Sequence, residues 1–454
     1  MSLRLFRHLT LWAFAAWMTA SASAQGLIRD TEIEETLRRW TDPILEVAGL
    51  EAPDVGLYII NDPSLNAFVA RGQNIHLHTG LLMAAETPGQ IKGVIGHETC
   101  HIACGHTVSR SRAAQVSSRP ALISIGLGVL AIAAGAGDAG AALIASSQQF
   151  AAVNFFKHTR AEEAAADQAA VAYLEALGQS PAGLVEFFEN YRYQEVLSDA
   201  RRYPYFRAHP MASERINRTR QLAEETGLWD VPVEPQTQLE FEMMQAKLVG
   251  FLTPPTQVFR RYPLSDTSAP ARYARSVAYM QAADVGAALA EIDGLIEDEP
   301  ENPYYHELRG DILFDAGRPG EAVPSHRAAT ELKPRQPLLL IRLAQSLSAR
   351  NEEGDHAAAE EALREALIAE QDNAYAWRQL AIAVEAQGRR AEAQLATAES
   401  AFHIGDLARA NAFAGRARNE LPAGTPLYRR ASDILAITDP RLPENRNFYR
   451  RFGP

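Results

Sequence analysis

The stretch "GVIGHETCHIACGHTVSR", residues 93–110, says most about what this chain is. It contains His97 and His101, four residues apart, with Glu98 directly after the first histidine. On a helix this spacing puts both imidazoles on one face, one turn apart, so that both can reach a single metal ion. Glu98 lies beside the pair, within reach of a water molecule at that ion. The stretch therefore predicts a two-histidine metal site on an apolar helix.

The order H-E-x-x-H is that of zinc peptidases. Two histidines do not hold a catalytic zinc, because such sites use three protein ligands and leave one position for water. A metzincin-type third histidine is excluded, since Cys104 and Thr107 stand where that pattern needs glycine and histidine. His106 would lie on the opposite side of the helix from His97, so we expect it to stabilise the helix end or the following loop.

A glutamate on a later helix is the better third ligand. The stretch "TRAEEAAAD", residues 159–167, places Glu163 and Asp167 four residues apart on one helical face. One carboxylate can bind a metal while the other accepts the N–H of a ligand histidine. The alternative is a solvated acidic face. Glu162 suits that alternative, because its spacing from Thr159 makes it the second residue of a capping box.

Length and charge limit the class of protein. The chain has 454 residues, 47% of them hydrophobic, which is enough for two or three domains with cores. Its formal net charge of −12 argues against nucleic acid as a partner.

The first 24 residues have the pattern of a secretory signal peptide. Arg4 and Arg7 precede an apolar stretch over residues 9–20, and an A-x-A cleavage site ends at Ala24, so we expect a cut after Ala24. A membrane anchor is the alternative, but the apolar stretch is short for a bilayer span. Export would bring the protein into an oxidising compartment.

The two cysteines, Cys100 and Cys104, lie one turn apart if a single helix contains both. Their side chains would then project along the helix rather than toward each other, and an unstrained disulfide is not expected. We predict two small buried residues beside the metal site.

The N-terminal half is predicted to mix helix and strand. A helix with a capping box at Thr31 and Glu34 is expected first, and a strand over 55–61 follows it. Residues 65–82 indicate a hairpin that turns near Gly72 and continues into a helix. The stretch "LNAFVA" in this hairpin suits an edge strand to which an extended peptide can add by main-chain hydrogen bonds.

The roles of two segments are predicted from their amino-acid composition. Residues 121–147 are apolar and rich in glycine, and we interpret them as a buried helical hairpin. A lid, or a segment in peripheral contact with a membrane, is the alternative for them. Residues 231–270 are rich in proline and are expected to join the two halves of the chain.

The C-terminal part repeats with a period of 34 residues. Pro300 and Pro334 are one period apart, and so are Pro303 and Pro337. This is the period of tetratricopeptide repeats, in which helix pairs stack into a solenoid. We expect about four units over 270–435, with a three-residue insertion around "RNEEGDH" before the third.

Four stretches, in order along the chain, resemble the BepA family of periplasmic β-barrel assembly-enhancing proteases, a branch of the HtpX-like and CAAX-prenyl-protease-like zinc peptidases. They are "NDPSLNAFVARGQNIHLHTGLL", "GHETCH", "TRAEEAAAD" and "HPMASERI". The resemblance implies an α+β fold that is mostly helical. A gluzincin-type metalloprotease domain over 25–262 would follow the signal peptide 1–24, and an α-helical tetratricopeptide-repeat solenoid would cover 263–454.

The resemblance also implies a metal-binding set. It makes His97, His101 and Glu163 the ligands of one Zn²⁺ ion per chain, and Glu98 the general base. The family motif usually has a second acidic residue where this chain has Ala165.

Two further residues acquire roles from the same resemblance. Asp167 is expected to donate a proton or to support a ligand from behind. His209 of "AHP" is expected near the metal, either as a donor to the oxyanion or as a ligand that closes the site. A helix-start role beside Pro210 is the alternative for His209.

These expectations together predict a periplasmic zinc endopeptidase that cleaves unfolded or stalled envelope proteins in outer-membrane β-barrel quality control. The resemblance implies that the repeats bind the outer-membrane assembly machinery. A chaperone or adaptor with a latent zinc site is the alternative. A purely structural zinc site is disfavoured, because it would leave Glu98 without a role.

Overall fold

The computed structural model describes residues 26–70, 72–106, 160–192, 209 and 213–445. They form two compact units: residues 26–29 with 36–241, and residues 30–35 with 242 onward. The signal peptide 1–24 and the segment 121–147 predicted from the sequence lie outside the described residues. The domain boundary predicted after residue 262 stays a prediction.

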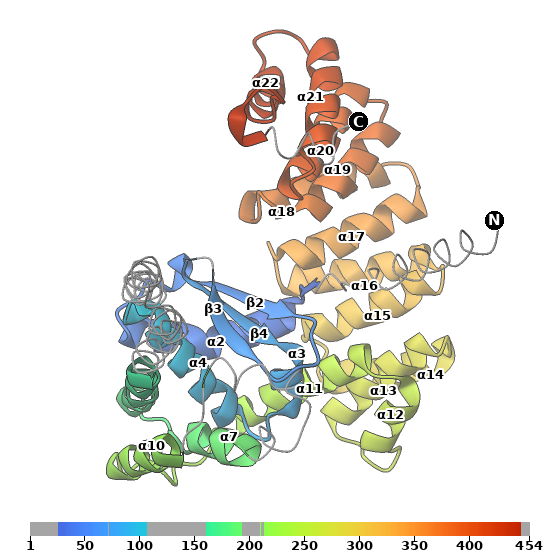
Figure 1. The fold of residues 1–454 in the computed structure, drawn as a ribbon. Coiled ribbons are helices and arrows are strands. Elements are labelled where there is room, and N and C mark those ends of the chain that lie inside the picture. The colour runs from blue at the N-terminus through green and yellow to red at the C-terminus, as the bar shows by residue number, and fades with distance from the viewer. Residues whose placement is uncertain (1–25, 71, 107–159, 193–208, 210–212, 446–454) are drawn as a thin grey trace, which may run out of the picture. The chain divides into compact units, whose positions relative to one another are not determined.

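A small mixed sheet anchors the first unit. Its strands, in spatial order, are β1 (Leu27–Ile28), β2 (Gly56–Ile60), β4 (Asn74–His78) and β3 (Ala67–Ala70). β2 and β4 run parallel, whereas β1 and β3 are antiparallel to their neighbours and form the two edges. The predicted strand and the predicted hairpin are both confirmed, and β4 leads directly into α3 (Thr79–Ala84) (Figure 1).

The other helices of the N-terminal half are α2 (Thr31–Val47), α4 (Pro88–Ala103), a helix over 160–176, α7 (Ala182–Arg192) and α10 (Ser213–Glu225). α4 packs on β3 and β4, α7 packs on α4, and α10 packs on α7. α4 begins where the side chain of Thr87 accepts a hydrogen bond from the Gln90 amide, with Pro88 in the first turn. Gly93 allows α7 to approach closely, because a Cβ there would lie 2.7 Å from Cβ of Leu184.

The start of α2 belongs to the second unit. Asp30 caps this helix, since its side chain accepts from the Ile33 amide at 3.0 Å and its own amide donates to Glu34 at 3.1 Å. The capping residue is therefore Asp30 and not Thr31 as predicted. Within the second unit, the buried Lys247 ammonium lies 2.9 Å from Asp30 and 3.1 Å from Glu32.

The second unit is a stack of helix pairs (Figure 1). The pairs are α13 (Ala269–Gln281) with α14 (Val285–Asp298), α15 (Pro303–Asp315) with α16 (Pro319–Leu332), α17 (Pro337–Arg350) with α18 (Asp355–Ala369), α19 (Ala374–Ala386) with α20 (Arg390–His403), and α21 (Leu407–Glu420) with α22 (Pro426–Ile437). The described part of this unit thus holds five pairs and not about four. The predicted fold class, α+β and mostly helical with a C-terminal helical-repeat solenoid, is confirmed.

The insertion lies where the sequence placed it. α13, α15 and α17 begin 34 residues apart, whereas α19 begins 37 residues after α17. The three extra residues are spread over this pair, because α17, the turn after it and α18 are each one residue longer than their counterparts in the pair before. In the turn, Asn351 and Gly354 adopt left-handed conformations with φ of 57° and 84°. Glycine and asparagine adopt this region at the lowest steric cost.

The proline-rich segment 231–270, which was expected only to join the two halves, is largely helical. It contains α11 (Pro235–Leu252) and α12 (Pro255–Arg261), whose prolines occupy first-turn positions that need no amide hydrogen bond. Met243 of α11 packs into the core around Tyr273. No helix in the described ranges is both long enough and apolar enough to cross a membrane.

Candidate metal centre

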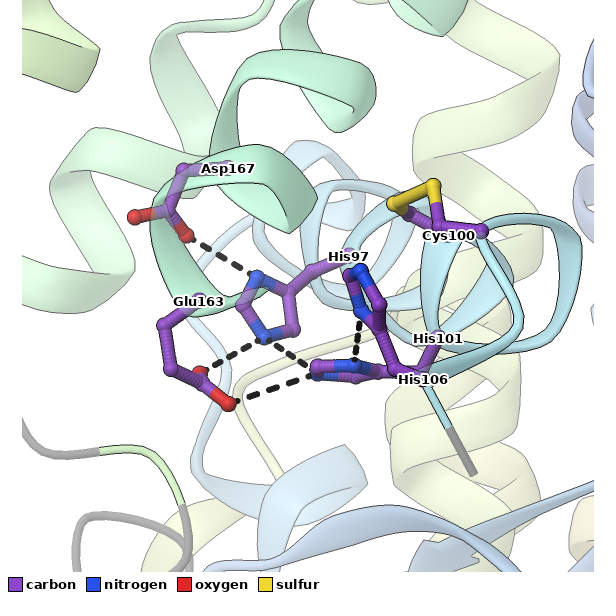
Figure 2. Close-up of a disulfide and its surroundings, with 7 residues drawn as sticks. His97, Cys100, His101, His106, Glu163 and Asp167 are labelled. Atoms are coloured by element: carbon purple, nitrogen blue, oxygen red, sulfur yellow. Dashed lines mark hydrogen bonds and ion pairs between the residues drawn. A yellow bond between two sulfur atoms is a disulfide. The ribbon is translucent and has the colours of Figure 1, made fainter. Parts of the chain in front are cut away.

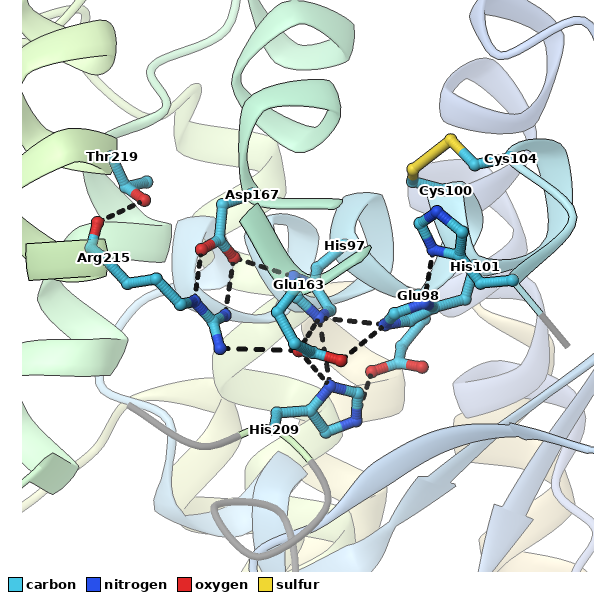
Figure 3. Close-up of polar contacts among 11 residues, drawn as sticks. His97, Glu98, Cys100, His101, Cys104, Glu163, Asp167, His209, Arg215 and Thr219 are labelled. Carbon is cyan, nitrogen blue, oxygen red and sulfur yellow. Dashed lines mark hydrogen bonds and ion pairs between the residues drawn. A yellow bond between two sulfur atoms is a disulfide. The ribbon is translucent and has the colours of Figure 1, made fainter. Parts of the chain in front are cut away.

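α4 places three of the predicted residues in the interior. His97 and Glu98 are 0% exposed and His101 is 2% exposed. The Nε2 atoms of the two histidines face each other at 3.2 Å, as the one-turn spacing predicts (Figure 3). Their Nδ1 atoms therefore point outward from the space between the rings and meet other side chains.

The helix over 160–176 brings Glu163 to the same point. Its Oε2 lies 3.3 Å from His97 Nε2, and its Oε1 lies 3.6 Å from His101 Nε2. Ligand atoms around a tetrahedral zinc, with bonds of about 2.0–2.1 Å, are separated by roughly 3.3 Å. The donor set of two imidazoles and one carboxylate, at these separations, therefore fits a zinc ion.

Asp167 supports the set from behind. Its Oδ1 lies 2.9 Å from His97 Nδ1, and the carboxylate is 2% exposed. With the Nδ1 proton held by this carboxylate, the Nε2 lone pair of His97 would be available to a metal ion that Glu163 and His101 also bind. The alternative of a solvated acidic face is wrong for this helix, because Glu163 and Asp167 are both buried.

Arg215 was not singled out from the sequence, although it lies within the quoted stretch "HPMASERI". It comes from α10, and its Nε and Nη2 donate to the two oxygens of Asp167 at 2.7 and 2.8 Å. Its Nη1 lies 3.4 Å from Glu163 Oε2, and its guanidinium packs on the ring of Phe188. The two buried carboxylates explain its place here, because buried negative charges need a cation beside them.

His209 lies between the carboxylates of the centre and is 2% exposed. Its Nδ1 is 2.8 Å from Glu163 Oε2, and its Nε2 is 3.4 Å from Glu98 Oε1. Ligand atoms of His97, Glu98, His101 and His209 all lie within 4.8 Å of one another. The structure thus brings together all six residues named from the sequence: His97, Glu98, His101, Glu163, Asp167 and His209 (Figure 3).

The charges of the centre favour a cation. Burial disfavours the charged form of His97, but hydrogen bonds to Asp167 and Glu163 outweigh it and raise its pKa to about 9. Burial likewise opposes ionisation of Glu163, yet His209 and His97 hold its pKa well below the usual range. The carboxylates therefore stabilise positive charge here, which a divalent cation would supply.

The end of α4 departs from two predictions (Figure 2). Cys100 and Cys104 form a disulfide, with their Cα atoms 5.2 Å apart. The expectation of two unlinked cysteines is wrong, because α4 ends at Ala103 and Cys104 is the capping residue. A residue at a helix end is not bound to the side-chain direction of a continuing helix.

His106 also departs from its helical projection. Gly105 adopts a left-handed conformation with φ of 69° and turns the chain back. His106 is consequently buried, and its Nδ1 lies 2.9 Å from His101 Nδ1. It therefore contacts one of the proposed ligands from behind, as Asp167 does for His97.

Comparison with known proteins defines the class first. Residues 29–223 match the model of peptidase family M48. The part of the chain ahead of the helical repeats therefore resembles an M48 peptidase domain, and this supports a metalloprotease.

Individual relatives then narrow the resemblance. The beta-barrel assembly-enhancing protease of Escherichia coli (strain K12) is 24% identical over 409 residues, 87% of this chain and 80% of that protein. A Vibrio cholerae relative is 24% identical over 310 residues, 65% of this chain and 62% of its own length. Metalloprotease LoiP of E. coli (strain K12) is 29% identical over 170 residues, 36% of this chain and 60% of LoiP. The chain resembles beta-barrel assembly-enhancing proteases over most of its length.

Two solved structures of MamA show a weaker likeness. They cover 39% and 42% of this chain, and 97% and 98% of their own chains, at 18% and 17% identity. Their TM-scores are 0.30 and 0.32.

Proposed function

We propose that this protein is a zinc-dependent endopeptidase, exported to the periplasm, that hydrolyses unfolded or stalled envelope proteins. One observation carries the proposal. His97, His101 and Glu163 form a buried triangle, and a second carboxylate, Glu98, lies beside it on the helix of the two histidines. A structural zinc site closes its fourth position with another protein ligand, whereas a peptidase leaves that position to water and needs a base beside it.

In this proposal His97, His101 and Glu163 hold one Zn²⁺ ion. The ion would supply Lewis-acid chemistry, acidifying water and polarising a peptide carbonyl. The Glu98 carboxylate takes a proton from the attacking water and gives it to the leaving amine. Asp167 keeps the Nδ1 proton of His97 in place, which fixes the tautomer of that ligand.

The edge strand β3 is the proposed place for substrate. The amide of His78 donates to the carbonyl of Asn66. Hydrogen-bonded pairs alternate along an antiparallel ladder, so Phe68–His76 and Ala70–Asn74 are hydrogen-bonded pairs too. The main-chain groups of Ala67 and Val69 then point away from β4. Ala67 is 0% exposed, so Val69, which is half-buried, has the more accessible of these groups. An extended chain can add there by main-chain hydrogen bonds, which favours unfolded over folded substrates.

The names of the relatives support the cellular role. Several are named beta-barrel assembly-enhancing proteases. We propose that the repeats of this chain bind outer-membrane assembly machinery or its clients, since stacked helix pairs present extended binding surfaces. The signal peptide cut after Ala24 would deliver the protein to the periplasm.

A chaperone or adaptor with a latent zinc site is the second candidate. The position of His209 favours it, because this ring contacts both a proposed ligand, Glu163, and the proposed base, Glu98. A centre closed in this way binds metal but does not turn over substrate until the ring moves.

Zinc analysis and cleavage of an unfolded protein test the proposal, with wild type beside Glu98→Gln. We expect about one zinc per chain in both, and cleavage by wild type alone. A chelator should abolish cleavage and added zinc should restore it. Equal cleavage by Glu98→Gln would overturn the mechanism. Zinc binding without cleavage under any condition would favour the second candidate.

A further inference from the structure

Three rings form a row across the sheet, one from each of three neighbouring strands. Tyr58 of β2 pairs directly with His76 of β4, which pairs directly with Phe68 of β3. Ring centroids are 5.3 Å apart for Tyr58 and His76, and 4.8 Å apart for His76 and Phe68. The ring planes differ by 22° and 4°, so both contacts are stacked.

The row lies on the less buried face of the sheet. Strand residues alternate between faces, and Ile75 and Leu77, which flank His76, are 0% exposed. Tyr58 is 38% exposed, and His76 and Phe68 are half-buried. A stacked aromatic row on a partly exposed face is not explained by packing of the core.

The row ends at the edge strand proposed to take substrate. Phe68 is nearly parallel to His76, so the opposite side of its ring is directed toward the next strand position. A residue directly across from Phe68 in an added strand has its side chain on the same face, with Cβ atoms about 4.5–5.5 Å apart. That residue would be the fourth member of the row.

We propose that Tyr58, His76 and Phe68 form a subsite that selects a flat aromatic side chain at one fixed position of an extended substrate. The inference rests on the proposed function and adds a substrate class to it. Aromatic pairs in offset-stacked geometry gain more than the burial of the same area, which favours a ring over an aliphatic side chain. The substrates are therefore unfolded chains with an aromatic residue at a set distance from the cleaved bond.

A peptide series tests the subsite. One phenylalanine is moved through an otherwise alanine, serine and threonine peptide that is cleaved at a bond identified by mass spectrometry. We expect one position at which phenylalanine raises kcat/KM by roughly 3- to 10-fold over alanine, the range of one aromatic pair. Cyclohexylalanine at that position should give a smaller gain, and phenylalanine one residue away should give none, because its ring would lie on the other face.

Matched variants locate the effect. Phe68→Leu keeps an apolar side chain without a ring, and should reduce the phenylalanine-to-alanine ratio to about one. Tyr375→Leu removes a half-exposed ring of α19 in the repeats and should leave the ratio unchanged. A ratio that survives Phe68→Leu, or wild-type cleavage that ignores the position of phenylalanine, overturns the subsite while the proposed function stands.

Failure of the proposed function gives a different result. In that case no peptide in the series is cleaved by wild type faster than by Glu98→Gln. Binding of the same peptides, labelled with a fluorophore, then tests the row without cleavage. Tighter binding of the phenylalanine peptide that is lost in Phe68→Leu supports the subsite, and equal binding of all peptides overturns it.

Discussion

Arg215 holds Asp167 through two hydrogen bonds, from Nε at 2.7 Å and from Nη2 at 2.8 Å, across 48 residues of sequence. Asp167 in turn holds His97 at 2.9 Å. The orientation of a proposed zinc ligand thus depends on a guanidinium that does not touch the ligand atom. Because Arg215 also contacts Glu163, it links α10 to two members of the centre.

Arg215→Gln should weaken zinc binding by about 10- to 100-fold, the usual effect of losing a partner behind a ligand. Arg215→Lys should recover only part of the affinity, because an ammonium cannot bind both oxygens of Asp167 in a planar fork. Competition with a chromophoric chelator measures the affinity. Arg218→Gln, on the exposed side of the same helix, is the control. Unchanged zinc affinity in Arg215→Gln would show that the residue only stabilises the fold.

His209→Ala should speed cleavage of an unfolded substrate and leave zinc bound. The ring contacts both Glu163 and Glu98, so removing it opens the space that water and substrate must share. Steady-state kinetics, which give kcat and KM, check this gating role when the zinc content is measured alongside. A fall in kcat of about 10²-fold at unchanged KM would instead assign the ring to the oxyanion. Unchanged activity would leave it a helix-start residue.

The disulfide should stabilise the end of α4. Closing so short a loop contributes about 2 kcal/mol in the chain-entropy description. Wild type should therefore unfold at lower temperature after reduction, and Cys100→Ser with Cys104→Ser should unfold at that lower temperature with or without reductant. Because His106 contacts His101 just beyond this turn, zinc affinity should fall in parallel. A melting temperature insensitive to reductant in wild type would contradict the prediction.

Local spacing predicted the parts of the centre that lie on regular helices. The one-turn spacings of His97 with His101 and of Glu163 with Asp167 needed only helical geometry, and the structure brings both pairs together. Proline and glycine positions likewise gave the repeat period and its insertion. These signals depend only on residues close together in the chain, so they can be recognised in a single sequence.

The predictions that failed concern residues whose positions depend on where a helix ends or on partners far away in the sequence. Cys104 and His106 were placed by continuing α4 beyond its end at Ala103, although Gly105 is a typical helix-stop signal. Arg215 was missed because nothing local distinguishes a buried arginine from a solvated one. The role of α11 was missed because prolines at first-turn positions resemble the prolines of a linker.

The stability of the repeat half as a separate fragment should depend on Lys247. Its buried ammonium has Asp30 and Glu32 as partners, and both lie in the segment 30–35, far from the repeats in sequence. Burial opposes the charge, but Asp30 and the neighbouring acidic groups hold the pKa of Lys247 well above its usual value. Burial also raises the pKa of Glu307, a further acidic group near Lys247, to about 8.

A fragment of residues 242–454 therefore keeps its helices but leaves an ammonium without its closest partners. Breaking a buried pair by removing one side costs about 3–5 kcal/mol, so Lys247→Met should raise the fragment's free energy of unfolding. In the full chain the same substitution should lower it, because Asp30 and Glu32 then lose their cation. Urea unfolding followed by circular dichroism measures both. A change of the same sign in fragment and full chain would show that residues 30–35 do not stabilise the repeats through Lys247.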